Sequence, residues 1–205
     1  MPDRLVVAFV PGVSPSKWAR VWNDRMRGVT LELRAVSETE AVQALEDGSA
    51  HMALVRLPID TEGRHVIPLW DEPAVVVASR DSAVAAVDEL SPEDLAGLGE
   101  PVLEGRDAAV MELVAAGVGV AVMPQQVARA LSRRDVLARP LIGGTPTRIA
   151  LAWPSEHPSP HADEFIGIVR GRTANSSRGS DPVRRRPADD GPRRRPTRGG
   201  RPERR

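Results

Sequence analysis

The stretch Glu112-Leu-Val-Ala-Ala-Gly-Val-Gly-Val-Ala-Val-Met-Pro124 decides the fold, because it predicts a helix end, a glycine turn, a buried strand and a proline in succession. Gly117 is suited to the left-handed conformation that ends a helix, and Val118 to Met123 is an apolar, β-branched run. Pro124 then opens a further helix, Gln125 to Leu131. The preceding helix has an i, i+3, i+4 apolar stripe made of Val110, Leu113 and Val114. Such a junction is typical of a packed α/β sheet, although an ordinary helix-to-strand connection explains these residues when taken alone.

The chain before this stretch alternates strands and helices. The expected elements are, in order, a strand Leu5 to Val10, a helix capped by Ser14 with Pro15 in its first turn, a strand Thr30 to Val36, a helix from the capping box Ser37-Glu-Thr-Glu40 to Gly48, and a strand His51 to Leu57. Trp18, Val21, Trp22 and Met26 give the first helix its apolar face. The order β, α, β, α, β predicts a parallel sheet with right-handed crossovers.

The remaining elements are shorter. They are strands at Val66 to Leu69, Ala74 to Ser79, Leu137 to Leu141 and Arg148 to Trp153, a capped helix from Ser91-Pro-Glu-Asp94 to Gly97, and a closing helix from about Pro160 to Val169 with Phe165, Ile168 and Val169 on one face.

Composition narrows the class of protein. The chain has 205 residues, 41% of them hydrophobic, and no cysteine, which fits one α/β domain and excludes a disulfide scaffold or a thiolate metal site. No apolar run approaches the roughly 20 residues of a membrane helix, and the start lacks the features of a signal peptide, so we expect a cytoplasmic location and no membrane partner.

The zero net charge hides a segregation of signs. Residues 171–205 hold 12 arginines against 4 acidic residues, which leaves 16 basic and 24 acidic residues in 1–170. We therefore predict a domain over 1–170 and a disordered basic tail over 171–205, because the tail has almost no apolar side chains to offset the entropy of ordering.

The order and spacing of these segments resemble the effector-binding (substrate-binding) domain of LysR-type transcriptional regulators. The similarity is carried by Leu5-Val-Val-Ala, Leu31-Glu-Leu-Arg, Gly48-Ser-Ala-His-Met-Ala-Leu-Val55, Leu69-Trp-Asp-Glu-Pro-Ala-Val-Val-Val-Ala78 and Leu113 to Pro124. The resemblance implies a type 2 periplasmic-binding-protein-like α/β fold, in which two small lobes joined by crossover strands surround a cleft for a small effector. Ala74 to Ser79 and a strand near Arg148 to Trp153 would be the crossings. Members of this family pair through helices of the first lobe, so a homodimer is possible, although core packing explains Trp18 and Trp22 equally well.

The sequence departs from the family pattern at three places. A helix-turn-helix does not precede the first strand at Leu5, so this chain is expected to stand alone without the family's DNA reader. Between Gly99 and Arg106 only Glu100-Pro-Val-Leu-Glu-Gly stands where the family places a further strand and helix, which predicts a reduced second lobe. His51 stands where the family often has an acidic residue.

Polar residues that follow the predicted strands form the candidate ligand site. In such folds ligands lie at the carboxyl ends of strands, where helix N-termini supply N–H donors for a carboxylate. The candidates are Ser14, Ser16, Lys17, Ser37, Thr39 and Arg56 on one side of the cleft, with Gly117 and Gly119 across it. A structural role also explains several of them: helix caps for Ser14 and Ser37, and solvated charges for Lys17 and Arg56.

Motifs of catalysis are not found in the sequence. It has no Gly-x-Ser-x-Gly elbow and no phosphate-binding loop, and Gly117-x-Gly119 follows a helix instead of a strand, which excludes a dinucleotide fingerprint. His157 and His161 have metal-ligand spacing only on a helix, and Pro158 and Pro160 favour a loop. We therefore expect no enzyme activity, no cofactor and no metal.

Two functions remain open. The first is a non-enzymatic sensing or regulatory domain, linked to transcription regulation, that binds a small anionic or aromatic effector or a protein partner. The second is a nucleic-acid-associated protein whose domain is a scaffold and whose tail makes non-specific phosphate contacts through Arg184, Arg185, Arg186, Arg193, Arg194 and Arg195. A merely solubilising tail, or one attracted to the acidic domain, would have the same composition.

Overall fold

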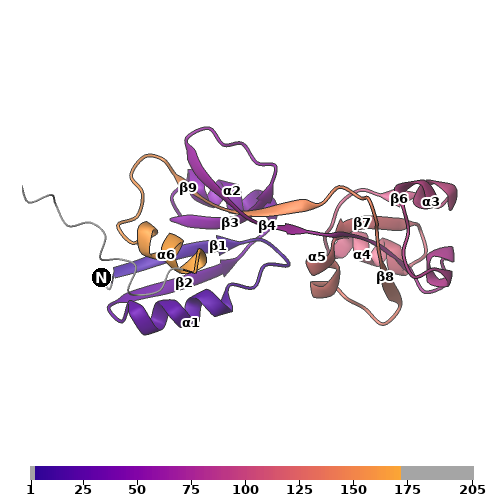
Figure 1. Cartoon of the computed structure of the whole chain (residues 1–205), viewed down its shortest axis with the longest axis horizontal. Coiled ribbons are helices and arrows are strands. Elements are labelled where there is room, and N and C mark those ends of the chain that lie inside the picture. The colour runs from indigo at the N-terminus through magenta and orange to yellow at the C-terminus, as the bar shows by residue number, and fades with distance from the viewer. Residues whose placement is uncertain (1–2, 172–205) are drawn as a thin grey trace, which may run out of the picture. The chain divides into compact units, whose positions relative to one another are not determined.

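The structure is a computed structural model, and it describes residues 3–171 (Figure 1). The arginine clusters of the predicted tail lie outside the described residues. The domain boundary predicted near residue 170 therefore stays a prediction.

A five-stranded sheet forms the first lobe, with the strand order β2-β1-β3-β9-β4. Its strands are β1 (Asp3–Phe9), β2 (Val29–Ala35), β3 (Met52–Leu57), β4 (Arg64–Glu72) and β9 (Thr147–Pro154). β1 is parallel to both β2 and β3, as the alternation of elements predicted, whereas β9 pairs antiparallel with β3 and β4. The helices of this lobe are α1 (Ser16–Arg25), α2 (Glu38–Glu46) and α6 (Ala162–Val169).

A four-stranded sheet forms the second lobe, with the strand order β6-β7-β5-β8. Its strands are β5 (Ala74–Ser79), β6 (Val102–Leu103), β7 (Val120–Pro124) and β8 (Val136–Pro140). Its helices are the 3-10 helix η1 (Ala83–Ala86), α3 (Pro92–Gly97), α4 (Ala108–Ala115) and α5 (Gln125–Ala130). Between Gly99 and Arg106, where the sequence predicted a missing strand and helix, the two-residue strand β6 is present and leads directly into the loop before α4.

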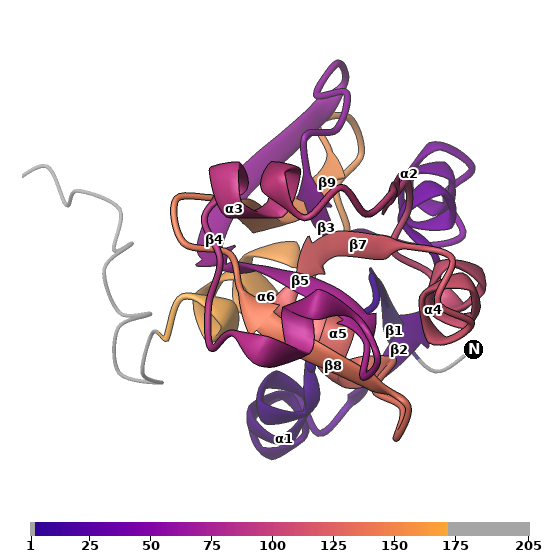
Figure 2. The same cartoon turned by 90° about the vertical axis from the view of Figure 1, so that its right-hand side faces the viewer.

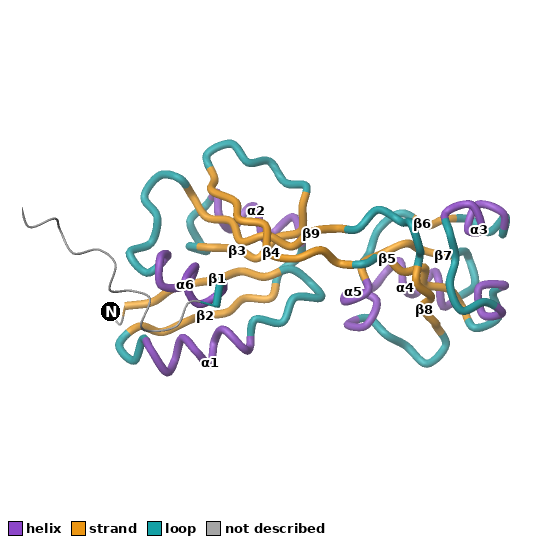
Figure 3. Tube along the Cα trace, viewed as in Figure 1, coloured by secondary structure: helices purple, strands orange, loops and turns teal. Residues whose placement is uncertain are grey.

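The chain passes between the lobes twice (Figure 3). It leaves the first sheet after Glu72 and enters β5 at Ala74, and it returns between Pro140 and Thr147. The predicted crossing strands were therefore misplaced, because Ala74–Ser79 lies within the second sheet and residues 148–153 lie within the first. The crossings are the short segments that precede these strands.

Each lobe has its own apolar core. In the first lobe α1 and α6 pack together, and the Trp22 and Phe165 rings lie 5.9 Å apart with both side chains fully buried. α2 covers the other face of that sheet (Figures 1 and 2). In the second lobe α4 and α5 pack on one face of the sheet, while η1 and α3 pack on the other. Trp18 and Trp22 are thus core residues.

Three local predictions were wrong. Ser14 does not cap α1, because the helix begins one residue later than predicted. Pro15 is at the N-cap, and it makes no side-chain cap hydrogen bond. Leu113 is 45% exposed, and Met111 takes its place on the buried face of α4 beside Val110 and Val114. Val118 is 50% exposed, since it belongs to the turn that precedes β7.

Candidate functional site

The order of strands in the first sheet creates a place where a site can form. β1 lies between β2 and β3, so the connections after β1 and β2 run over opposite faces and separate at the carboxyl edge of the sheet. Open α/β sheets bind ligands at such a point. Pro11, which follows β1, and Arg56, near the end of β3, meet there.

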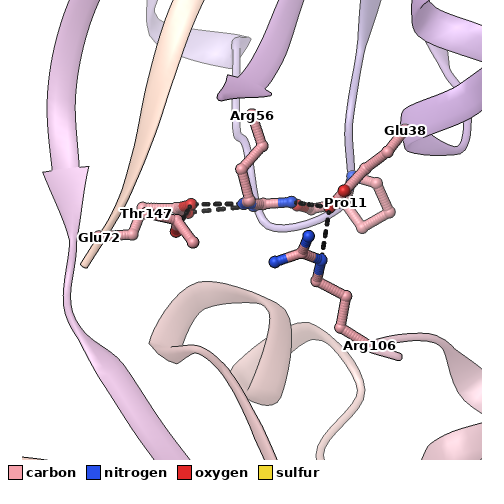
Figure 4. Close-up of polar contacts among 6 residues, drawn as sticks. All are labelled: Pro11, Glu38, Arg56, Glu72, Arg106 and Thr147. Atoms are coloured by element: carbon pink, nitrogen blue, oxygen red, sulfur yellow. Dashed lines mark hydrogen bonds and ion pairs between the residues drawn. The ribbon is translucent and has the colours of Figure 1, made fainter. Parts of the chain in front are cut away.

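Arg56 is held by a buried pair of hydrogen bonds to Glu72 (Figure 4). Its Nε donates to Glu72 Oε2 at 2.7 Å and its Nη2 donates to Glu72 Oε1 at 3.2 Å, and the two side chains are 0% and 1% exposed. Nη2 also donates to the Pro11 carbonyl at 2.9 Å, and the Thr147 hydroxyl donates to Glu72 Oε2 at 3.1 Å. The interpretation of Arg56 as a solvated surface charge was therefore wrong.

Glu38 extends this network to the second lobe. Its Oε1 accepts from Arg56 Nη1 and also pairs with Arg106 Nε at 3.2 Å (Figure 4). Glu38 stands at the start of α2, and Arg106 precedes α4 in the second lobe. We call Pro11, Glu38, Arg56, Glu72, Arg106 and Thr147 the junction cluster, because it includes both lobes and both crossings.

The two carboxylates of the junction cluster favour the charged form of Arg56. Burial acts to lower the pKa of Arg56, but the hydrogen bonds and negative charges of Glu72 and Glu38 outweigh it, so the pKa is raised above its usual value. No buried side-chain nitrogen or oxygen within residues 3–171 lacks a hydrogen-bond partner. Arg56 is thus permanently charged, compensated and fixed in orientation.

Three of the predicted site residues come together at the surface. Ser14, Ser16 and Lys17 line a hollow of about 550 Å³ with Arg20, at the start of α1. Two cationic side chains and two hydroxyls in one hollow could bind a small anion, which is the chemistry that the sequence analysis expected of this loop.

Ser37 and Thr39 begin α2. The Ser37 hydroxyl accepts from the Glu40 N–H at 3.2 Å, and Glu40 accepts from the Ser37 N–H at 2.8 Å, which confirms the capping box. Thr39 is exposed in the first turn of the helix. Neither residue hydrogen-bonds with Arg56; the residue of this helix start that does so is Glu38, through its carboxylate.

Gly117 and Gly119 do not join the other predicted residues. They line a hollow of about 290 Å³ with Ser79, Asp81, Ser82, Ala83 and Glu100. Pro124, at the other end of β7, pairs with Ala74 beside the first crossing, so both glycines lie at the end of the second sheet away from that crossing. Each also has a structural role: Gly117 has φ +73°, and a Cβ on Gly119 would lie 2.3 Å from the Pro101 carbonyl oxygen.

Sequence reasoning missed Glu38, Glu72, Arg106 and Thr147. Glu72 was visible as a carboxylate next to the apolar run that became β5, and that contrast could have indicated a buried partner. Glu38 was read as part of a cap sequence. Arg106 and Thr147 have no local signal, since their contacts depend on how distant segments fold together.

His51 and His161 have structural contacts. His51 Nδ1 accepts from the Val6 N–H at 2.9 Å. This backbone N–H of β1 thus has a partner one residue before β1 begins to pair with β3. His157 and His161 lie in a non-helical segment, as predicted, and His161 Nε2 lies 2.7 Å from Asp3 Oδ2. Among the described residues no group of three or more potential metal ligands occurs, and no helix is long and apolar enough to cross a membrane.

Comparison with known proteins agrees with this architecture. The family model described as "LysR substrate binding domain" matches residues 3–104 and 105–174. The chain belongs to the LysR substrate-binding domain family. The break between the two matched pieces falls between β6 and α4.

Relatives of this LysR-type domain are transcription regulators. The Hca operon transcriptional activator HcaR of Escherichia coli K12 is 24% identical over 204 residues, which cover 84% of this chain and 69% of that protein. An H2O2-bound cysteine mutant of Corynebacterium glutamicum OxyR has a TM-score of 0.65 at 20% identity, over 82% of this chain and 67% of that one. The BenM effector-binding domain with its effector benzoate has a TM-score of 0.65 at 16% identity, over 88% of this chain and 96% of that one. These structures show the fold.

Proposed function

We propose that this chain is the effector-sensing domain of a LysR-type regulator and that it binds a small organic acid where its two lobes meet. The observation that supports the proposal is the junction cluster, in which Arg106 of the second lobe and buried Arg56 of the first lobe share one carboxylate. A ligand that changes those contacts acts on both lobes at once. A sensor requires a ligand that binds two arrangements of the lobes with different affinities, and a ligand that breaks a contact between the lobes meets this requirement.

The hollow at the start of α1 supplies further positive charge to the same lobe. Ser14, Ser16, Lys17 and Arg20 line it, and Ser37 and Thr39 begin the neighbouring helix at the carboxyl edge of the sheet. We assign these side chains to effector recognition and exclude Gly117 and Gly119 from it, because they lie at the far end of the second sheet. The absence of cysteine excludes sensing through a thiol of these 205 residues.

The test is a thermal-melting titration of the full chain with aliphatic and aromatic monocarboxylates, including benzoate, and with their neutral amides. A ligand that binds only the folded protein at 100 times its Kd adds about 2.7 kcal/mol to the free energy of unfolding, so the Tm should rise with an acid and not with its amide. Arg106→Gln should reduce this rise, while Arg129→Gln, an exposed arginine of the same lobe, should not. A panel in which acids and amides behave alike contradicts the proposal.

A second candidate function follows from the charge of residues 171–205, with 12 arginines and 4 acidic residues. Under this alternative the tail tethers the domain to nucleic acid through phosphate contacts that release counterions. Fluorescence anisotropy of labelled duplex DNA should then show salt-dependent, sequence-independent binding by the full chain and none by residues 1–170. Binding that survives the truncation would contradict a role for the tail.

A further inference from the structure

The junction cluster is electrically balanced by its own side chains. Two arginines and two carboxylates meet there, and their formal charges cancel. An anion that entered the intact cluster would add an uncompensated negative charge beside side chains that are 0% and 1% exposed, which is energetically unfavourable. An anionic ligand therefore requires one of the two carboxylates to leave.

Glu38 is the carboxylate that can leave. Its side chain is 34% exposed and that of Arg106 is 40% exposed, so Glu38 regains water when it turns away. Arg56 would then keep two hydrogen bonds to Glu72 and one to the Pro11 carbonyl. Glu72 is buried at 1% exposure and also accepts from Thr147, so its removal would cost far more.

We propose that Glu38 is an internal competitor of the effector. Its carboxylate pairs with Arg106 and with Nη1 of Arg56, and a ligand with one carboxylate takes its place. Withdrawal of Glu38 leaves the cluster with a charge of +1, which matches a monoanion and disfavours a dianion. This inference rests on the proposed function, and it adds the charge of the ligand and a specificity role for one residue.

The experiment follows the Arg106 Nε–H signal of the full chain by NMR during a titration with formate. Formate is the smallest carboxylate, so it tests the competition without the rest of an effector, and sodium chloride keeps the ionic strength constant. Because a partly exposed ion pair is worth about 0.2–1 kcal/mol, Glu38→Gln should lower the formate concentration at half-saturation by about 1.4- to 5-fold. Glu46→Gln, at the other end of the same helix, is the matched control and should leave it unchanged.

Two further variants keep the outcome decisive. The double variant Arg106→Gln/Glu38→Gln should lose the gain in formate affinity that Glu38→Gln shows over the wild type. Because this variant lacks Arg106, its titration follows the Arg56 Nε–H signal. Glu38→Asp retains the charge but shortens the side chain, so its half-saturation should lie between those of the wild type and Glu38→Gln, and it replaces Glu38→Gln if that variant loses its native spectrum. Equal half-saturation in the wild type and these variants, or no formate response in any of them, overturns the inference. If formate competes with Glu38 but no organic acid raises the Tm, the proposed function fails and the competition stands.

Discussion

At the scale of single residues, the buried pair of Arg56 and Glu72 has the greatest consequence. Arg56 lies at the end of a parallel strand and Glu72 lies at the first crossing, so the pair ties the carboxyl edge of the first sheet to the point where the chain leaves it. The sequence identified Arg56 as a polar residue at this edge. It could not identify the partners, which are 16 and 18 positions away and come from a different strand and a helix.

Arg56→Met should be strongly destabilising. It leaves the Glu72 carboxylate buried without its counter-ion, which typically costs about 3–5 kcal/mol, and urea denaturation of the variant measures that loss. The matched control is Arg148→Gln, which breaks the exposed pair that Arg148 of β9 makes with Asp71, the residue next to Glu72 on β4. The control should change the urea concentration at the unfolding midpoint very little. An equal loss of unfolding free energy in both variants would show that burial of the pair is not the cause.

His51 should make stability depend on pH. Burial, and then the positive charges of Arg4, His161 and Arg34, lower the pKa of His51, and protonation would also place a donor against the Val6 N–H. The unfolded chain therefore takes up this proton at a higher pH than the folded chain does. The contribution to folding stability is complete above the unfolded pKa of about 6.5 and is lost as the pH falls through and below that value.

His51→Asn tests this effect, because it retains an acceptor and cannot titrate. Denaturation curves at pH about 7.5 and about 5.5 should show a smaller loss on acidification in the variant than in the wild type. His157→Asn, in an exposed loop, serves as the control and should behave like the wild type. A variant that loses as much stability as the wild type would assign the acid sensitivity to other groups.

At the scale of elements, a capping sequence predicted the first residue of the helix correctly in two cases and incorrectly in a third. Ser37 forms the predicted capping box, and Ser91, which was predicted only as a cap, forms one as well. Ser14 precedes Pro15 in a similar pattern, yet Pro15 takes the N-cap of α1 and Ser14 stays exposed. The residue before a proline is biased towards extended conformations, and this alone does not fix where the helix begins.

Ser37→Ala and Ser14→Ala should therefore differ in stability. Ser37→Ala removes a cap from α2 and should cost about 1 kcal/mol, whereas Ser14→Ala removes no cap and should cost much less. Thermal or urea denaturation of the two variants measures the difference. Equal costs would mean that Ser14 supports the helix in a way the contacts do not explain.

At the scale of the whole molecule, the second lobe is an insertion into the first. Residues 73–146 contain every strand of the second sheet, and Glu72 and Thr147 at their borders are paired in antiparallel register. A two-residue hairpin turn can join strands in such a register. The first lobe also has its own core, which includes α1, α2 and α6.

Replacement of residues 73–146 by Asn-Gly should thus leave a folded first lobe. Circular dichroism and a cooperative thermal transition would test this, with the Trp22 indole, which donates to the Val29 carbonyl, as a probe of the native core. A variant that carries the same replacement plus Phe165→Ala should lose the cooperative transition, because it opens a cavity beside Trp22. A non-cooperative single-lobe variant would mean that the first lobe depends on the second.

The sequence by itself determined the order of the longer elements, the parallel part of the first sheet, the capping box at Ser37 and the family, because these depend on apolar periodicity and on residues close together in the chain. The tertiary structure decided the crossings, the antiparallel role of β9 and the partners of Arg56. It also separated Gly117 and Gly119 from the other candidates, since the direction of β7 decides which of its ends lies near the crossing. Local patterns cannot encode these outcomes, because ion pairs and strand neighbours form between segments whose proximity exists only after folding.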